Sequence, residues 1–280
     1  MHVQRYTDPD AFYRRIEAHL LAREAENNLM FGILNAVQRG DYYDPYMAVV
    51  EHEGAIALVA LRTPPYRVIF STDDAVEAAL AIADDLRGTQ QAGVTGAQQT
   101  ARAFAEAWCA ANGKSFALEI PMHIYRLERV IPAQRGAGVL RRADPASERA
   151  LLKQWMTGFH QDTFGDSHDD EIEETLNFWL NSPPDARGLF IWEVDGQPVS
   201  MTGYAGPTPN GIRVNYVYTP PELRRRGYAS ACTAAVTQYL LDHGRKFCFL
   251  FTDRRNPTSN HIYQEIGYEL VCDADSYEFT

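Results

Sequence analysis

The stretch VNYVYTPPELRRRGYAS, residues 214–230, contains the strongest structural signal in the chain. An apolar, β-rich run ends at the pair Pro220–Pro221, and proline cannot continue a strand ladder. Three arginines and Gly227 follow, and then a helical pattern begins. The first amides of a helix have no internal partner and lie at the positive end of the helix dipole, so they bind anions. The sequence predicts a strand, an anion-binding loop and a helix; an ordinary turn with surface arginines is the alternative.

The hydrophobic pattern around this loop indicates helices packed on a mixed sheet. In the second half of the chain we expect strands near 138–142, 188–194, 198–205, 211–219, 246–253 and 268–279. We expect helices at 144–160, 169–181, 229–241 and 257–266, with a loop before the third. The fold class is therefore α/β (α+β).

The two halves of the chain share a pattern. The segment Val3–Pro9 shares Val, Arg, Asp and Pro with Val139–Pro145, at an offset of 136. A second match, at an offset of 131, aligns Gly96 with Gly227. Ordered agreement of this kind favours a duplicated domain. We expect a first domain at residues 1–130, a linker at 131–138 and a second domain at 139–280.

Two motifs in the second half resemble those of the GNAT (GCN5-related) N-acetyltransferases. The acyl-CoA loop [RQ]-x-x-G-x-[GA] is matched by Arg224, Gly227 and Ala229. The motif N-x-x-[SA]-x-x-[LI]-Y-x-x-x-G-[FY] is matched by Asn256, Ser259, Ile262, Tyr263, Gly267 and Tyr268. The resemblance covers about 139–280 and implies two GNAT-like domains, each with a mixed, mostly antiparallel sheet flanked by helices.

The resemblance also implies roles for single residues. Val217, Tyr218 and Thr219 would pair with the pantetheine arm of acetyl-CoA as if it were an added strand. Backbone amides from Arg225 to Ser230, a stretch that includes Arg226, Gly227, Tyr228 and Ala229, would hold the pyrophosphate, and the charge of Arg224 would bracket CoA. Asn256 and Ser259 would contact the cofactor, although either could equally cap the following helix. Tyr263 would lie near the sulfur as general acid, since a phenol is protonated at neutral pH. Acetyl-CoA is the only cofactor implied, as a co-substrate, and no metal.

The first half does not have these features. At the offset of 131, Gly93, Val94 and Thr95 stand where the second half has its three arginines. We expect a degenerate copy that shapes the acceptor cleft; a phosphate cradle at Gly93–Gly96 is the alternative.

The general base is the weakest point of the resemblance. Some members of the family carry a Glu on the strand before the loop, but here no Asp or Glu occurs between Asp195 and Glu222. Glu193 is the favoured candidate, with His160, His168, a water chain or the substrate itself as alternatives. By analogy with the fold, the acceptor pocket would be lined by His160, Phe164, Trp179, Tyr204 and Tyr216.

Composition narrows the classes of partner. The 280 residues include 26 Lys+Arg and 37 Asp+Glu, a net charge of −11. This balance argues against a nucleic-acid binder and is compatible with a cationic amine acceptor. We expect Arg254 and Arg255 to join the arginines of the loop in bracketing CoA. The eight His residues show no metal-ligand spacing.

The chain has the sequence features of a cytoplasmic protein. No uncharged apolar run reaches the ~18 residues needed to span a bilayer, and the first residues lack a signal-peptide core. The four cysteines stand far apart, as expected of reduced and mostly buried thiols. We expect a monomer or homodimer that contacts neither membrane nor nucleic acid.

The function predicted is N-acetyl transfer from acetyl-CoA to a primary amine of a small molecule or peptide, by direct attack in a ternary complex. The alternative is a non-catalytic acyl-CoA-binding sensor or regulatory module.

Overall fold

The computed structural model describes residues 1–132, 137–165 and 168–280. It divides into two compact units. The first contains Met1–Ile124, Phe251–Asn256 and Leu270–Thr280, and the second contains Tyr125–Leu250 and Pro257–Glu269. The expected linker, 131–138, lies partly outside the described residues, and the domain limits given above stay predictions.

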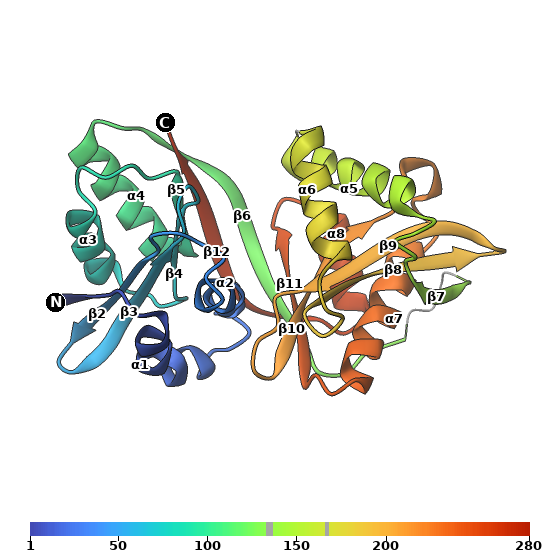
Figure 1. Cartoon of the computed structure of the whole chain (residues 1–280), viewed down its shortest axis with the longest axis horizontal. Helices are drawn as coiled ribbons and strands as arrows, with labels where there is room; N and C mark the ends of the chain where they lie inside the picture. Colours follow the sequence, from blue (N-terminus) through green and yellow to red (C-terminus); the bar gives the residue numbers. More distant parts are fainter. Residues whose placement is uncertain (133–136, 166–167) are drawn as a thin grey trace. The chain divides into compact units, whose positions relative to one another are not determined.

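The two halves of the chain have the same order of elements, strand–helix–helix–strand–strand–strand–helix–strand–helix–strand, apart from a short 3-10 turn, η1 (Pro221–Leu223) (Figure 1). The first series is β1 (His2–Tyr6), α1 (Pro9–Leu21), α2 (Asn28–Gln38), β2 (Tyr46–His52), β3 (Ala55–Arg62), β4 (Val68–Phe70), α3 (Val76–Asp85), β5 (Gly93–Ala97), α4 (Gln98–Asn112) and β6 (Phe116–Leu127). The second is β7 (Val139–Arg142), α5 (Arg149–Phe164), α6 (Asp169–Leu180), β8 (Arg187–Val194), β9 (Gln197–Ala205), β10 (Gly211–Tyr218), α7 (Tyr228–Asp242), β11 (Phe247–Asp253), α8 (Pro257–Glu265) and β12 (Glu269–Phe279). The predicted duplication of an α/β fold is confirmed.

The register of the repeat was predicted only in part. The offset of 136 does join equivalent elements, β1 and β7. The offset of 131 is wrong, because it aligns α7 with α4, whereas the element order pairs α7 with α3. Both α4 and α7 have 15 residues and precede a strand, which produces the false match. The true equivalent of the arginine loop in the first unit is the short segment 71–75, which contains Asp73 and Asp74.

Each unit has a mixed, mostly antiparallel sheet. In the first, neighbouring strands follow the order β1-β2-β3-β4-β5-β12, with β4 and β5 parallel and the other pairs antiparallel. In the second, β7, β8, β9 and β10 are antiparallel in turn, and β10 is parallel to β11. The parallel pair thus occupies the same place in both copies.

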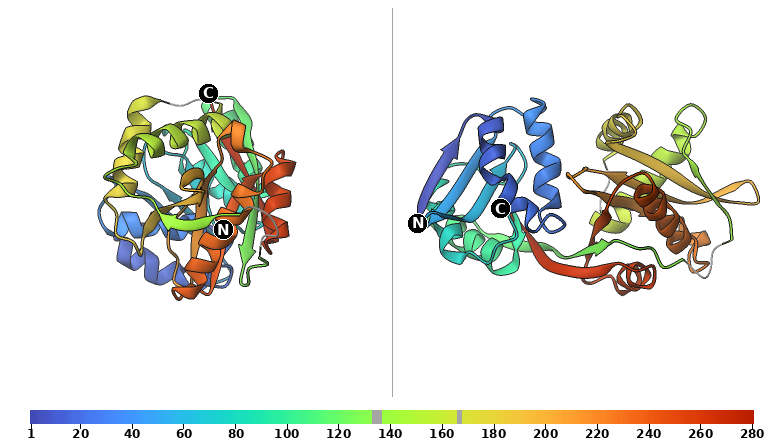
Figure 2. Two further views of the ribbon diagram at one scale, coloured as in Figure 1. Left: turned by 90° about the vertical axis from the view of Figure 1, so that its right-hand side faces the viewer. Right: turned by 90° about the horizontal axis from the view of Figure 1, so that it is seen from below.

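Alternation along the strands gives each sheet two apolar faces. On β8, Leu189 and Ile191 pack with α5 and α6, whereas Phe190 and Trp192 pack with α7. The helices of the second unit accordingly cover opposite faces of its sheet (Figures 1 and 2). The first unit repeats this arrangement, since α1 and α2 share one buried cluster and α3 and α4 the other.

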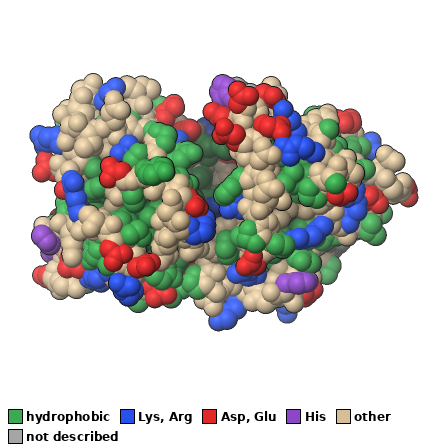
Figure 3. All heavy atoms as spheres, in the orientation of Figure 1, with side chains coloured by type: hydrophobic (Ala, Val, Ile, Leu, Met, Phe, Trp, Pro, Cys, Tyr) green, Lys and Arg blue, Asp and Glu red, His purple; other side chains and the backbone are tan. Residues whose placement is uncertain are grey.

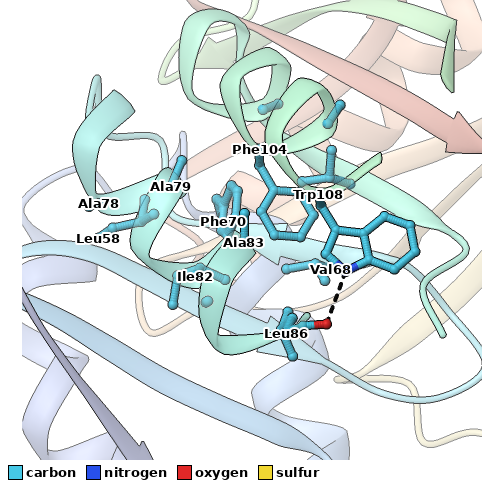
Figure 4. Packing of buried hydrophobic residues seen from close by; sticks show 14 of the residues in the cluster. Leu58, Val68, Phe70, Ala78, Ala79, Ile82, Ala83, Leu86, Phe104 and Trp108 are labelled. Atoms are coloured by element: carbon cyan, nitrogen blue, oxygen red, sulfur yellow. Dashed lines mark hydrogen bonds between the residues drawn. The ribbon is translucent and has the colours of Figure 1, made fainter. Parts of the chain in front are cut away.

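The core of the first unit is closed by aromatic rings from α4. Phe104 is fully buried and meets Phe70 edge-on at 5.2 Å between ring centroids. Trp108 packs beside it and donates its indole N–H to the carbonyl oxygen of Leu86 at 3.0 Å (Figure 4). The indole is thus buried without leaving its polar group unpaired.

The first helices of the two halves begin differently. The Asp8 carboxylate caps α1 by accepting from the amide of Asp10 at 2.9 Å, and Pro9 is the first helical residue. In the second half the helix expected from 144 begins at Arg149. The carboxylate of Asp144 there accepts from the Ser147 hydroxyl at 2.6 Å, which stabilises a turn before the helix.

The cysteines of the described chain agree with what the sequence led us to expect. All four cysteines are free thiols, and Cys109, Cys232 and Cys248 are buried. Among the helices of the described ranges, none is long and apolar enough to cross a bilayer.

Replacing Phe104 with Ala should destabilise the first unit, because it removes a fully buried ring. We expect the free energy of unfolding to fall by about 3 kcal/mol. Hydrogen exchange by mass spectrometry in a urea series, read on peptides of α3 and α4, measures this change. The control is Leu80→Ala, since Leu80 lies on α3 and is 44% exposed. Equal effects of the two substitutions would contradict the assignment of Phe104 to the core.

Candidate functional site

The parallel pairing of β10 with β11 ends early. It joins Gly211–Arg213 to Phe247–Phe249 and does not continue. On its other side, β10 pairs with β9, but the register shifts between Asn215 and Tyr218, and Tyr216 has a positive φ of 48°. In the described chain, the end of β10 therefore has no strand partner on the β11 side. An extended ligand can add to such an edge through main-chain hydrogen bonds.

Side chains hold the end of β10 in place. The Ser200 hydroxyl donates to the carbonyl oxygen of Tyr218 at 3.0 Å, and the Arg224 guanidinium donates to that of Thr219 at 2.9 Å. Of the three residues expected to pair with pantetheine, Tyr218 and Thr219 therefore already have side-chain donors at their carbonyl oxygens. Val217 is the one whose carbonyl oxygen accepts from no side chain among the described residues. The role of Ser200 was not predicted, and a serine inside a strand gives no sequence signal for it.

The loop after β10 presents backbone amides. Arg225 and Gly227 have positive φ values of 62° and 83°, and Gly227 is the N-cap of α7. The first helical hydrogen bond runs from the amide of Ala231 to the carbonyl of Gly227 at 2.9 Å. No side chain caps this helix. Among the described residues, the amides of 228–230 therefore have no acceptor, and they lie at the positive end of the helix dipole.

The three arginines of the loop are exposed but differ in their partners. Arg224 forms an ion pair with Asp162 and lies over the ring of Tyr218, at 5.9 Å from its centroid. Arg226 reaches only the carbonyl of Glu222, at 3.4 Å, and Arg225 has no ion-pair partner in the described chain. Arg225 and Arg226 are thus available to an incoming anion. Asp162 lies in the last turn of α5.

Arg254 and Arg255, which we expected to join the loop arginines around CoA, are both paired with carboxylates. Arg254 donates to Asp273 at 3.1 Å and to Asp275 at 2.9 Å, and Arg255 pairs with Asp253 at 2.8 Å. These five residues all belong to the first unit, where the carboxylates compensate both arginines. Their sequence spacing gave no sign of these partners.

Tyr263 is a buried phenol with an unused hydroxyl. It lies on α8, is 8% exposed, and meets Tyr268 edge-on at 6.0 Å between centroids. Burial raises the pKa of Tyr263 to about 12, so the phenol is protonated at neutral pH. Its hydroxyl has no hydrogen-bond partner among the described residues. Ser259 lies one turn earlier on α8, and Asn256 directly precedes that helix but groups with the first unit.

Glu193 is committed to an ion pair. Its carboxylate accepts from Arg141 at 2.6 Å, and the same guanidinium binds Glu148 at 2.7 Å. The two carboxylates together raise the pKa of Arg141 above its ordinary value. By alternation along β8, Glu193 shares the face of Ile191, on the side of α5 and α6, whereas Tyr263 belongs to the core on the side of α7. The sheet thus separates the two residues proposed for catalysis.

An aromatic group gathers beside the open end of β10, on the side of α5 and α6. The Tyr216 hydroxyl is 3.0 Å from Nε2 of His160, and its ring lies 4.8 Å from Phe159 and 4.9 Å from Trp179. The ring of Phe164 lies 5.5 Å from that of His160, tilted by 58°. Burial lowers the pKa of His160 and raises that of Tyr216 to about 12.

Tyr204, also expected in the acceptor lining, is placed elsewhere. It is 2% exposed within the cluster on the α7 side, and its hydroxyl donates to the carbonyl of Pro184 at 2.6 Å. The alternation of β9 explains the difference, since Ala205 and Met201 face α5 and α6. Phe159 takes its place near Tyr216.

On the face drawn in Figure 3, basic and acidic side chains are interspersed rather than gathered into a basic surface. No group of three or more His, Cys, Asp or Glu suited to a metal ion occurs among residues 1–132, 137–165 and 168–280. The end of β10 provides an open strand edge for an extended ligand, and the start of α7 provides backbone amides, without acceptors among the described residues, for an anion.

Comparison with known proteins shows which family the second half of the chain resembles. The family model "Acetyltransferase (GNAT) family" matches residues 150–268. No curated protein matches the chain significantly.

Solved structures resemble the chain over nearly its whole length. A GCN5-related N-acetyltransferase from Kribbella flavida is 17% identical, covers 92% of this chain and 94% of its own, and has a TM-score of 0.57. A GNAT-family acetyltransferase from Colwellia psychrerythraea is 9% identical and covers 100% of both chains, with a TM-score of 0.60. A tandem GNAT protein from the clavulanic acid biosynthesis pathway is 12% identical, covers 100% of this chain and 98% of its own, and has a TM-score of 0.55.

At these identities the structures establish the fold, and the family model establishes the kinship of the second half. Residues 150–268 are thus a domain of the GNAT acetyltransferase family, within a chain that has the tandem GNAT fold.

Proposed function

We propose that the protein is an N-acetyltransferase that transfers an acetyl group from acetyl-CoA to a primary amine of a small molecule or peptide. The observation that carries the proposal is the succession of an open β10 edge, a loop with two free arginines and an uncapped α7. Pantetheine carries amides that can pair with a strand edge, and pyrophosphate suits a helix N-terminus. A ligand with both groups in series, such as CoA, matches the order of these features along the chain.

The donor would lie along the second unit. In this proposal pantetheine pairs with the main chain at Val217, next to Tyr218 and Thr219. The pyrophosphate accepts from amides between Arg225 and Ser230, with Gly227, Tyr228 and Ala229 in the same turn, and Arg226 adds charge at the rim. Arg224 positions the loop through Asp162. Asn256 and Ser259 would contact the pantetheine arm at the start of α8.

The chemistry needs little beyond alignment. A thioester is activated already, so the protein must align the amine, stabilise the oxyanion and accept a proton. The amine nitrogen forms a bond to the carbonyl carbon, and the carbon–sulfur bond then breaks. Tyr263 donates a hydrogen bond to the sulfur as negative charge develops there, which its high pKa allows over the whole neutral range. This direct attack takes place in a ternary complex.

The first unit would not bind a second acetyl-CoA. Its segment equivalent to the arginine loop, 71–75, is short and contains Asp73 and Asp74. Asp73 is held by His19 at 2.9 Å and by the Ser71 hydroxyl at 2.6 Å, which together with Arg23 keep the pKa of its carboxyl low. An ionised carboxylate in this place repels phosphate.

A non-catalytic acyl-CoA sensor is the second candidate. The observation that favours it is the engagement of Glu193 by Arg141, in a segment where β9 and β10 carry no carboxylate. Thiol release from acetyl-CoA with a panel of primary amines separates the two functions, because a sensor binds the thioester without turnover. The acidic charge of the chain makes cationic amines a natural part of that panel.

Replacing Arg225 and Arg226 together with Gln should weaken acetyl-CoA binding by about tenfold at low salt, because two charge-assisted contacts to phosphate are lost. The effect should shrink as salt is raised, since the contacts are exposed. Isothermal calorimetry measures the affinity. Arg245→Gln, elsewhere in the second unit, is the control and should leave it unchanged. Unaltered affinity in the double variant would refute the placement of pyrophosphate at this loop.

Tyr263→Phe should lower kcat by about 100-fold while the affinity for acetyl-CoA changes less than twofold, because only the proton donor is removed. Since the pKa of Tyr263 is about 12, the wild type should not lose activity as pH rises through 10. Thiol release with the best amine of the panel gives kcat. Tyr239→Phe, on α7, serves as the matched control. An unchanged kcat in Tyr263→Phe would end its assignment as the acid.

A further inference from the structure

The open end of β10 is flanked on its two faces by different tyrosines. Tyr263 belongs to the cluster on the α7 side, together with Val217 of β10. Tyr216, the residue before Val217, packs on the opposite side with α5 and α6. A thioester paired with β10 at Val217 would therefore have one phenol near each face of the sheet.

The backbone holds Tyr216 in an uncommon conformation. Its φ of 48° lies in the left-handed region, which aromatic residues rarely adopt, and it sits inside the register shift of β10. The ring is fixed by Phe159 at 4.8 Å and by Trp179 edge-on at 4.9 Å. Such rigid placement next to the edge that would bind the donor is what a reacting group requires.

The hydroxyl of Tyr216 has a defined partner. It lies 3.0 Å from Nε2 of His160, on the helix α5 that covers this face. Burial lowers the pKa of His160, and Glu171 on α6 opposes this effect. Around the pair, Asp162 on α5 is paired with Arg224, and the guanidinium of Arg213 on β10 lowers the pKa of Tyr216 against the effect of burial. A neutral imidazole can therefore accept the proton of the phenol.

We propose that Tyr216 and His160 form the proton-accepting pair of the acetyl transfer, with Tyr216 contacting the amine and His160 acting through it. The inference rests on the proposed function and supplies the base that Glu193, held by Arg141, would not provide.

The proton of the amine is removed by a relay through Tyr216 to His160. The amine nitrogen forms its bond to the acetyl carbon, and a proton leaves the nitrogen for the oxygen of Tyr216. The original proton of that phenol passes to Nε2 of His160, which becomes an imidazolium. The carbon–sulfur bond breaks with its electron pair on sulfur, opposite Tyr263. Afterwards the imidazolium gives its proton to solvent, and the thiolate takes up a proton from the Tyr263 hydroxyl, which solvent then restores. The products are an amide and a thiol.

The test compares wild type with Tyr216→Phe, His160→Gln and the double variant. His243→Gln and Tyr239→Phe, both on or next to α7, are controls. Thiol release from acetyl-CoA is followed from pH 5 to 10 with saturating 2-phenylethylamine, spermidine and a tetrapeptide with a free N-terminus. Calorimetry with acetyl-CoA shows that each variant is folded and binds the donor.

We expect each single variant to lose about 100-fold in kcat with donor affinity kept within twofold, and the double variant to lose no more than either single one. In the wild type, kcat should rise with pH along a limb below the ordinary imidazole range, and the variants should lack that limb. A purely structural role would not remove it. His160→Gln provides the test if Tyr216→Phe does not fold.

Three results would overturn, respectively, the Tyr216–His160 pair, the proposed function and the donor site. A kcat within threefold of wild type in both single variants, or a retained limb, overturns the pair and leaves the proposed function standing. Donor binding without thiol release from any amine overturns the proposed function and the pair with it. Failure of the wild type to bind acetyl-CoA overturns the donor site itself.

Discussion

The early end of the β10–β11 ladder is the constraint on which the candidate site depends. Parallel pairing stops at Arg213 and Phe249, and β10 continues for five residues without a partner on that side among the described residues. Unpaired main-chain groups at a sheet edge are costly to bury and ready to bind. The shift in register at Tyr216 turns the same segment, the proline pair ends it, and the following loop delivers α7 with its amides uncapped.

The same architecture is used twice with different chemistry. In both halves of the chain a helix connects the two parallel strands, α3 between β4 and β5 and α7 between β10 and β11, but only α7 has arginines and a left-handed glycine at its start. The first half has Asp73 just before α3, ionised and held by His19. The two halves thus share a fold but differ in the charge of the loop before the connecting helix, which is basic in the second half and acidic in the first.

Sequence patterns predicted the elements well where periodicity was strong. The strand that ends at Tyr218, the helix that follows it and the element order of the second half were all visible in the positions of apolar residues, prolines and glycines. The register of the repeat was not, because two helices of equal length produced a false match. The sheet faces were not predicted. Tyr204 was placed in the acceptor lining by analogy with the fold, and Glu193 was favoured because β10 carries no carboxylate, whereas alternation along β8 and β9 decides on which face each lies. Ion pairs between distant residues, such as Arg224 with Asp162, leave no local signal at all.

The central claim is that acetyl-CoA lies along the open end of β10 with its pyrophosphate on the first amides of α7. Amide hydrogen exchange of the full chain, measured by NMR or by mass spectrometry with single-residue fragmentation, tests it directly. On addition of acetyl-CoA, exchange should slow by at least tenfold at the amides of Tyr228, Ala229 and Ser230, and also at Val217. The amides at the start of α3 in the first unit should be unaffected. Protection confined to the first unit, or none at Tyr228–Ser230 under saturating acetyl-CoA, would contradict the account.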